Sequence, residues 1–136
     1  MPEKKYEILE HKADLKIRAF GKKKEELFLN MLTGLMENLR PEGIGKKEKR
    51  EIKIDSQDLE TLLVDFLSEV LYLSQVNKEI YNNIKFKKFT NTELEGELIG
   101  QKVGRFGEDI KAVTYYDLDV HQKEDGAWEA TVLFDI

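Results

Sequence analysis

Two stretches with helical periodicity constrain the fold of this chain most, because each must bury one apolar side against a partner surface. In both stretches apolar residues recur at spacings of one, three and four, as on a helix with one apolar face. We predict the first helix over about Lys24–Asn38, ended by Pro41 and Gly43, and the second after an N-cap at Asp55 or Ser56. The apolar positions are Leu27, Phe28, Met31, Leu32, Leu35, Met36 and Leu39, then Leu59, Leu62, Leu63, Phe66, Leu67, Val70 and Leu71.

Most of the remaining sequence alternates apolar and polar residues, which is typical of strands with one buried face. We expect strands near residues 15–20, 51–55, 84–87, 93–99, 118–120 and 128–135. Glu124, Asp125 and Gly126 separate the last two as a tight hairpin turn. Long helices followed by a run of antiparallel strands predict an α+β fold. The expected architecture is a single-domain sandwich over residues 1–136, in which both helices pack on one face of a mainly antiparallel sheet.

Composition excludes several kinds of function. The 136 residues contain no cysteine and only 2 histidines, which excludes disulfides, thiol catalysis and cysteine-based zinc sites. The net charge of −5 argues against general binding of nucleic acid or anionic membranes. The longest apolar run is only Val70–Leu73, and no apolar signal segment follows Met1. We therefore expect a cytoplasmic protein with no membrane partner and no disulfide partner.

No complete catalytic constellation is visible in the sequence. Gly43–Lys47 lacks the other residues of a phosphate-binding loop, and the spacing of Gly100, Gly104 and Gly107 is not a dinucleotide fingerprint. We interpret these glycines as turn residues. The serines show no nucleophile elbow. The pattern therefore favours a protein that is not an enzyme.

Three basic runs are interpreted as solvated surface. They are Lys22–Lys24, Lys46–Arg50 and Lys85–Lys88. Glutamates interleave or flank the first two, as on an exposed charged face. A local basic patch that touches RNA held by a partner stays open as an alternative.

Four motifs, in order along the chain, resemble those of the archease family. Glu10–Asp14 (EHKAD) is similar to its EHTAD-type signature, and Leu62–Leu73 (LLVDFLSEVLYL) to its LLVDWLSELLYL helix. Lys111–Tyr115 (KAVTY) resembles the KAVTYH element, and Leu133–Ile136 (LFDI) the closing strand. The resemblance covers essentially the whole chain.

The resemblance implies a non-enzymatic activator of the tRNA-splicing RNA ligase. That ligase joins a 3′-phosphate or 2′,3′-cyclic phosphate RNA end to a 5′-hydroxyl end through a guanylylated histidine. An archease is expected to promote guanylylation and multiple turnover, and to meet RNA only through the ligase. Two alternatives stay open: a chaperone-like adaptor for tRNA-modifying enzymes such as a tRNA methyltransferase, and a small hydrolase using metal-bound water at Asp14.

The resemblance also implies a metal site formed by Asp14, Asp135 and the C-terminal Ile136. Two carboxylates and the terminal carboxylate would make an all-oxygen donor set, which suits Ca²⁺, with Mg²⁺ or Mn²⁺ in its place, and not zinc. Without the resemblance, the residues favour a simpler interpretation in which Asp14 caps a turn and Asp135 is a terminal acid.

Partner contacts are expected at His11, Asp109, Lys111 and Tyr115, again from the resemblance. Lys111 and Tyr115 have the same parity on the predicted strand, so they should project from one face. An exposed Lys111 there could meet a phosphate or carboxylate of the ligase complex.

Overall fold

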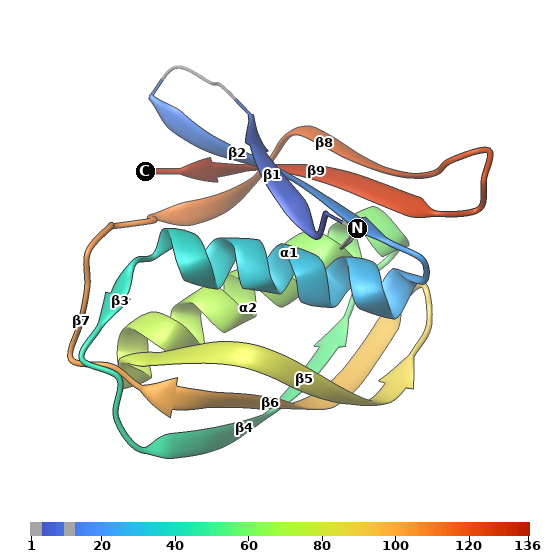
Figure 1. Ribbon diagram of the computed structural model, residues 1–136. Coiled ribbons are helices and arrows are strands. Elements are labelled where there is room, and N and C mark those ends of the chain that lie inside the picture. Colours follow the sequence, from blue (N-terminus) through green and yellow to red (C-terminus); the bar gives the residue numbers. More distant parts are fainter. Residues whose placement is uncertain (1–3, 10–12) are drawn as a thin grey trace.

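The structure is a computed structural model that describes residues 4–9 and 13–136 (Figure 1). Its two helices are α1 (Lys24–Asn38) and α2 (Leu59–Asn77). Its strands are β1 (Tyr6–Leu9), β2 (Asp14–Gly21), β3 (Pro41–Glu42), β4 (Lys47–Asp55), β5 (Glu79–Phe89), β6 (Glu93–Lys102), β7 (Arg105–Phe106), β8 (Ala112–Gln122) and β9 (Trp128–Asp135).

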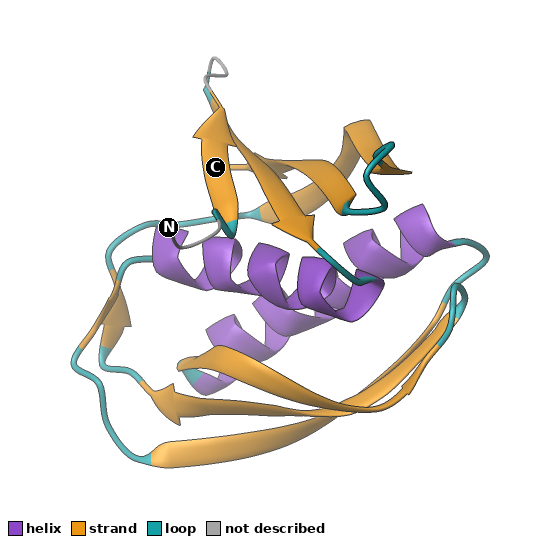
Figure 2. Cartoon of the chain, turned by 45° about the vertical axis from the view of Figure 1, so that its right-hand side comes forward, coloured by secondary structure: helices purple, strands orange, loops and turns teal. Residues whose placement is uncertain are grey.

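The helix pair lies between two antiparallel sheets, which gives three layers (Figures 1 and 2). One sheet has four strands in the order β1-β2-β9-β8, and the other has three in the order β4-β6-β5. β3 and β7 form a separate two-stranded pair beside the helix ends. The predicted α+β class with antiparallel strands is therefore confirmed.

The structure differs from the expected single sheet, because the helices are covered on two sides. In α1 the neighbouring pairs Leu27–Phe28, Met31–Leu32 and Leu35–Met36 are all buried. Successive helical residues point about 100° apart, so such pairs give an apolar stripe too broad for one sheet to cover. The breadth of this stripe therefore accounts for the second sheet.

The core joins all three layers. The Phe28 and Phe66 rings link the two helices, with centroids 5.7 Å apart, and Phe89 of β5 packs edge-on against Phe28 at 4.9 Å. The four-stranded sheet adds Ile17 and Phe134, which are fully buried. Neither sheet therefore has a core of its own.

Both predicted ends of α1 are confirmed, but the predicted N-cap of α2 is wrong. The cap is Asp58, whose carboxylate accepts a hydrogen bond from the Thr61 amide at 2.7 Å. Asp55 is still the last residue of β4, paired with Glu93, and the Ser56 amide donates to the Thr92 carbonyl. Because β4 stays paired with β6 as far as Asp55, α2 begins only after the predicted cap positions.

The turn interpretation holds for the β8–β9 hairpin but is wrong for Gly100. Gly126 has φ +91°, as the hairpin turn requires. Gly100 lies inside β6, where a Cβ would sit 1.7 Å from the carbonyl oxygen of Ile80 across a bulge in β5. The glycine permits a close backbone approach at this bulge.

Within the described residues, neither helix has the length and apolar character needed to cross a membrane.

Candidate metal and partner site at one end of the four-stranded sheet

Strand register brings the two predicted metal-ligating aspartates together. Asp14 begins β2 and is paired directly with Asp135 at the end of β9. Directly paired residues of antiparallel strands project from the same face, with Cβ atoms about 4.5–5.5 Å apart. Residues 121 positions apart in the chain therefore present their carboxyl groups at the same end of one sheet.

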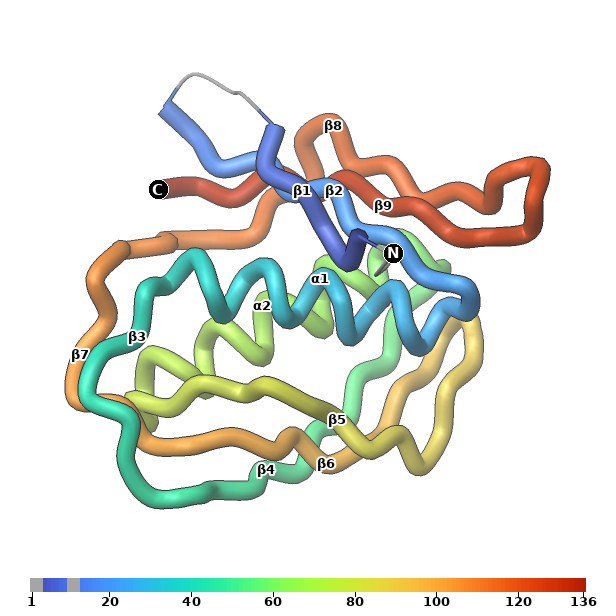
Figure 3. Tube along the Cα trace, viewed as in Figure 1, coloured from blue at the N-terminus to red at the C-terminus, as the bar shows by residue number. Residues whose placement is uncertain are grey.

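The chain terminus lies at the same place. Ile136 follows Asp135 directly and is 41% exposed, and Figure 3 shows the C-terminus beside the beginning of β2. Asp14 is preceded by Ala13 at φ 61°, in the left-handed region that costs a non-glycine residue about 1 kcal/mol. Such local strain is often found at functional sites. The predicted ligands Asp14, Asp135 and Ile136 are thus neighbours here.

The donor set at this sheet end consists of oxygen atoms. The two aspartate carboxylates are hard ligands, the kind that Ca²⁺ and Mg²⁺ prefer. These residues therefore fit a hard divalent cation.

Lys111 also belongs to this end. Its amide donates a 2.7 Å hydrogen bond to the carbonyl oxygen of Asp135, and the next residue, Ala112, pairs with Asp135 in the β8–β9 ladder. Its side chain is exposed. Lys111 lies one residue before β8, and its main chain continues the ladder that holds Asp135.

Tyr115 points toward α2. Its hydroxyl donates a 2.9 Å hydrogen bond to Asp65, whose other oxygen accepts from Ser56 at 2.6 Å. The hydrogen bond to the Asp65 carboxylate raises the pKa of Tyr115 above its usual value, because it favours the neutral phenol. The Tyr115 side chain is nevertheless 56% exposed.

The two remaining predicted partner-contact residues, Asp109 and His11, are not shown in contact with the aspartate pair. Asp109 is exposed in the segment between β7 and β8, two positions before Lys111. His11 lies outside the described residues. Of the three predicted partner residues that the structure describes, Lys111 is the one held against Asp135, and Tyr115 lies further along β8.

Sequence reasoning missed a face of α2 next to Tyr115, which we define as the half-buried Asp65 and Glu69 and the exposed Tyr72 and Val76. Tyr72 and Val76 are 58% and 61% exposed. Gln75, in the same turns, donates to the Ile110 carbonyl at 2.8 Å and so joins α2 to the segment that leads to Lys111. The signal was present in the sequence as large side chains at helical spacing outside the buried stripe. α2 contains no lysine or arginine, so this face is acidic as well as partly aromatic.

A second missed cluster lies further along β8 and β9. Asp119, His121 and Glu129 present ligand-type atoms within 4.8 Å of one another. His121 Nδ1 lies 2.6 Å from Asp119 and Nε2 lies 3.4 Å from Glu129, while Arg18 Nε lies 3.9 Å from Glu129. Both ring nitrogens already face carboxylates, so we interpret this cluster as a surface network of ion pairs and hydrogen bonds.

The fold and the oxygen-rich sheet end together define a small α+β protein with a helix pair between two antiparallel sheets and a candidate cation site at the chain terminus. Comparison with known proteins makes the assignment specific. The model of the Archease protein family (MTH1598/TM1083) matches residues 6–136. The chain belongs to the archease family.

Curated relatives are similar over nearly their whole length. "Protein archease" of Methanosarcina barkeri is 37% identical over 142 residues, covering 98% of this chain and 97% of the relative. The corresponding protein of Pyrococcus furiosus is 34% identical over 143 residues, covering 98% and 99%.

Solved structures show the same fold. Protein 1598 of Methanobacterium thermoautotrophicum superimposes with a TM-score of 0.73 at 24% identity, covering 97% of this chain and 99% of that one. The Thermotoga maritima archease, described as a possible chaperone, gives a TM-score of 0.67 at 25% identity, covering 100% and 98%.

Proposed function

We propose that this protein is a non-enzymatic activator of the tRNA-splicing RNA ligase and acts through the sheet end that holds Asp14, Asp135 and Ile136. The observation that carries the proposal is the direct cross-strand pairing of Asp14 with Asp135 beside the chain terminus. Three of the four family-like motifs supply residues to this end or to its edge: Asp14, Lys111 and Asp135.

Ca²⁺ is the proposed ion at this end, with Mg²⁺ or Mn²⁺ in its place, and it would supply concentrated positive charge there. The protein's own residues have separate roles. Asp14 and Asp135 would hold the ion, and the Lys111 amide fixes the main chain of Asp135 by its 2.7 Å hydrogen bond. The exposed Lys111 side chain would contact an anionic group of the ligase complex.

The proposal is tested by reconstitution with the cognate ligase, GTP labelled at the α-phosphate, and Ca²⁺. We expect the parent protein to stimulate labelling of the ligase and to take up no label itself. Asp14→Asn, Asp135→Asn and deletion of Ile136 should each abolish most of the stimulation and weaken Ca²⁺ binding in calorimetry. Loss of a direct ligand should lower the affinity for Ca²⁺ by roughly tenfold or more, because even the loss of a residue that only supports a ligand typically has an effect of that size.

Asp119→Asn is the matched control, because Asp119 is an exposed aspartate on the same sheet but away from this end. It should stimulate like the parent. If the parent fails to stimulate, or if all three site variants stimulate normally, the proposal is wrong. Lys111→Ala should fold normally, bind Ca²⁺ normally and stimulate poorly, which separates partner contact from metal binding.

A chaperone-like adaptor for tRNA-modifying enzymes is the second candidate. The exposed Tyr72 and Val76 on the α2 face favour it, because large exposed apolar side chains in one patch commonly mark protein-binding surfaces. This function predicts that the protein suppresses heat aggregation of a tRNA methyltransferase. A Tyr72→Ser/Val76→Ser variant should lose that effect while keeping ligase activation.

A further inference from the structure

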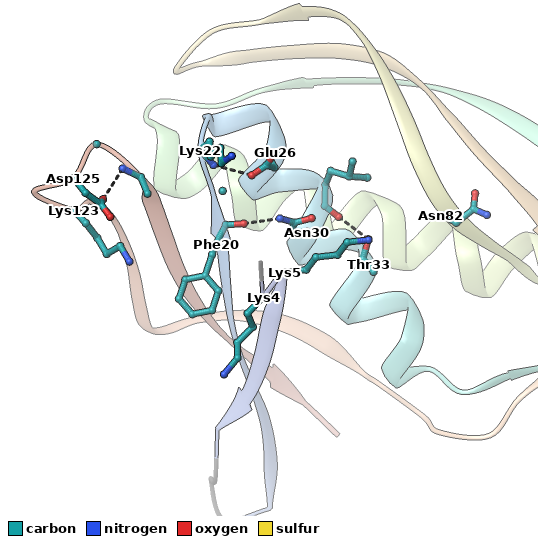
Figure 4. Close-up of a pocket in the computed structure, with 14 residues that line it drawn as sticks. Lys4, Lys5, Phe20, Lys22, Glu26, Asn30, Thr33, Asn82, Lys123 and Asp125 are labelled. Atoms are coloured by element: carbon teal, nitrogen blue, oxygen red, sulfur yellow. Dashed lines mark hydrogen bonds between the residues drawn. The ribbon is translucent and has the colours of Figure 1, made fainter. Parts of the chain in front are cut away.

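We propose that a basic pocket at the opposite end of the four-stranded sheet binds the phosphate of a nucleotide. The pocket has a volume of about 930 Å³ and lies between the end of β2, the start of α1 and the β8–β9 hairpin (Figure 4). Asp14 begins β2, whereas Phe20 and Gly21 end it at this pocket. At about 3.3 Å per strand residue, the two ends are about 23 Å apart. The inference therefore does not depend on the proposed ligase function.

Four lysines from three segments of the chain line the pocket: the adjacent Lys4 and Lys5, then Lys22 and Lys123. Among the described residues, two acidic residues line it, Glu26 and Asp125. Both carboxylates accept backbone hydrogen bonds, from the Lys22 amide at 2.8 Å and the Ala127 amide at 2.9 Å. The described part of the lining is thus net positive in a protein whose net charge is −5. A concave surface lined by one sign of charge raises the local concentration of the opposite ion.

Two of these lysines are available to an anion. Among the described residues, neither Lys5 nor Lys123 forms an ion pair with a carboxylate. Lys4, in contrast, contacts Glu7 at 3.0 Å. Lys123 Nζ lies 5.8 Å from the centroid of the Phe20 ring, so one wall combines a cation with an aromatic surface. Figure 4 shows Lys5 reaching along α1 toward Thr33, while Lys123 and Asp125 come from the hairpin.

The other lining groups fit a nucleotide better than inorganic phosphate. Asn30, Thr33 and Asn82 supply polar side chains, and Phe20 and Leu29 supply apolar surface for a base or sugar. The Asn30 side-chain Nδ2 donates a 2.6 Å hydrogen bond to the Phe20 carbonyl, which fixes the end of β2 against α1 at one wall of the pocket. Ligand pockets of about 300–1,000 Å³ are the usual size for molecules of this class.

The test titrates the full chain with guanosine 5′-monophosphate, inorganic phosphate and a short oligoribonucleotide. The sole tryptophan, Trp128, directly follows the lining residue Ala127 and reports binding by fluorescence, with calorimetry as a second readout. We expect the mononucleotide to bind more tightly than inorganic phosphate. Lys5→Gln/Lys123→Gln should weaken binding by roughly tenfold or more, because hydrogen bonds to charged groups contribute about that much each.

Lys46→Gln/Lys85→Gln is the control, since it removes the same charge from exposed positions outside the pocket. The inference is overturned if no probe binds, or if the two double variants lose affinity equally, which would indicate unspecific attraction. An oligoribonucleotide that binds about tenfold more tightly than the mononucleotide would support the site and assign it to RNA, because added phosphate contacts strengthen binding. Equal affinities for the oligoribonucleotide and the mononucleotide would support the site and assign it to free nucleotide.

Discussion

Glu79, the first residue of β5, has a fully buried carboxylate whose negative charge is paired with Arg50 and Lys102. Arg50 donates two hydrogen bonds to it, at 2.9 and 2.8 Å, and Lys102 lies 3.3 Å away. The Tyr81 hydroxyl donates a third hydrogen bond at 2.7 Å. The Arg50 hydrogen bonds, against the opposing effect of burial, lower the pKa of Glu79 to about 2. The charge is therefore part of the folded core.

This lowered pKa predicts acid sensitivity. Because the folded-state pKa lies below the ordinary value of 4.5, the stabilisation is complete above pH 4.5 and is lost as pH falls toward about 2. Glu79→Gln should lower the free energy of unfolding at neutral pH by roughly 1–3 kcal/mol. It should also flatten the dependence of stability on pH between these values. Urea unfolding across the acid range measures both, and an unchanged slope in the variant would contradict the assignment.

The aspartate pair predicts that calcium stabilises the fold. An ion that binds only the folded chain raises stability by about 2.7 kcal/mol at a concentration one hundred times its dissociation constant. Adding Ca²⁺ should therefore raise the melting temperature of the parent, and a chelator should reverse the change. Asp135→Asn should show little response, whereas Asp119→Asn should respond like the parent.

A left-handed residue that is not glycine follows the C-cap of α1, and another is the C-cap of α2. Arg40 has φ 50° shortly after α1, and Lys78 has φ 53° as the C-cap of α2. Such residues bear a steric cost from the Cβ atom that glycine avoids. Tertiary hydrogen bonds hold both residues, since the Gly107 amide donates to the Arg40 carbonyl at 2.8 Å and the Val103 amide donates to the Lys78 carbonyl at 2.9 Å.

Lys78→Gly should stabilise the protein by about 0.5–1 kcal/mol, because relief of the left-handed strain outweighs the added freedom of the unfolded chain. Lys78→Ala keeps the Cβ atom and should show no such gain. Thermal unfolding of both variants gives the comparison. A gain in the alanine variant alone would point to charge or propensity instead of backbone strain.

α2 has one buried and one exposed side, and the two should respond differently to truncation. Phe66→Ala removes a fully buried ring that packs against Phe28 and should cost about 3–5 kcal/mol. Leu63→Ala should cost about 2–5 kcal/mol for the same reason. Tyr72→Ala, on the exposed side of the same helix, should change stability by no more than about 0.5 kcal/mol. Equal losses at Phe66 and Tyr72 would mean that the helix faces are misassigned.

At the scale of the whole molecule, the shared helix layer predicts one cooperative unfolding transition. Both sheets pack on the same helices, and residues of each sheet belong to a single core cluster. Trp128 fluorescence reports the four-stranded sheet, and far-ultraviolet circular dichroism reports the helices. The two thermal transitions should coincide in the parent and shift together in Phe66→Ala. Separate midpoints would show that one sheet unfolds independently.

Local patterns in the sequence determined much of this protein. Helical spacing located α1 at both ends, alternation located most strands, and the Asp125–Gly126 turn located the last hairpin, because each depends on residues near one another in the chain. The motif resemblance pointed to the archease family before any geometry was known. It also named Asp14 and Asp135, although spacing alone could not pair residues at opposite ends of the chain.

Only the tertiary structure decided the rest. Strand order placed Asp14 opposite Asp135 and the helices between two sheets, and pairing of β4 with β6 moved the N-cap of α2 to Asp58. The α2 face and the basic pocket likewise depend on segments far apart in the chain, such as β1, α1 and the β8–β9 hairpin. Periodicity records which side of an element is buried, but which elements meet depends on long-range packing. For this reason the sequence predicted the helices and strands, whereas strand pairing and packing decided which residues lie together at each candidate site.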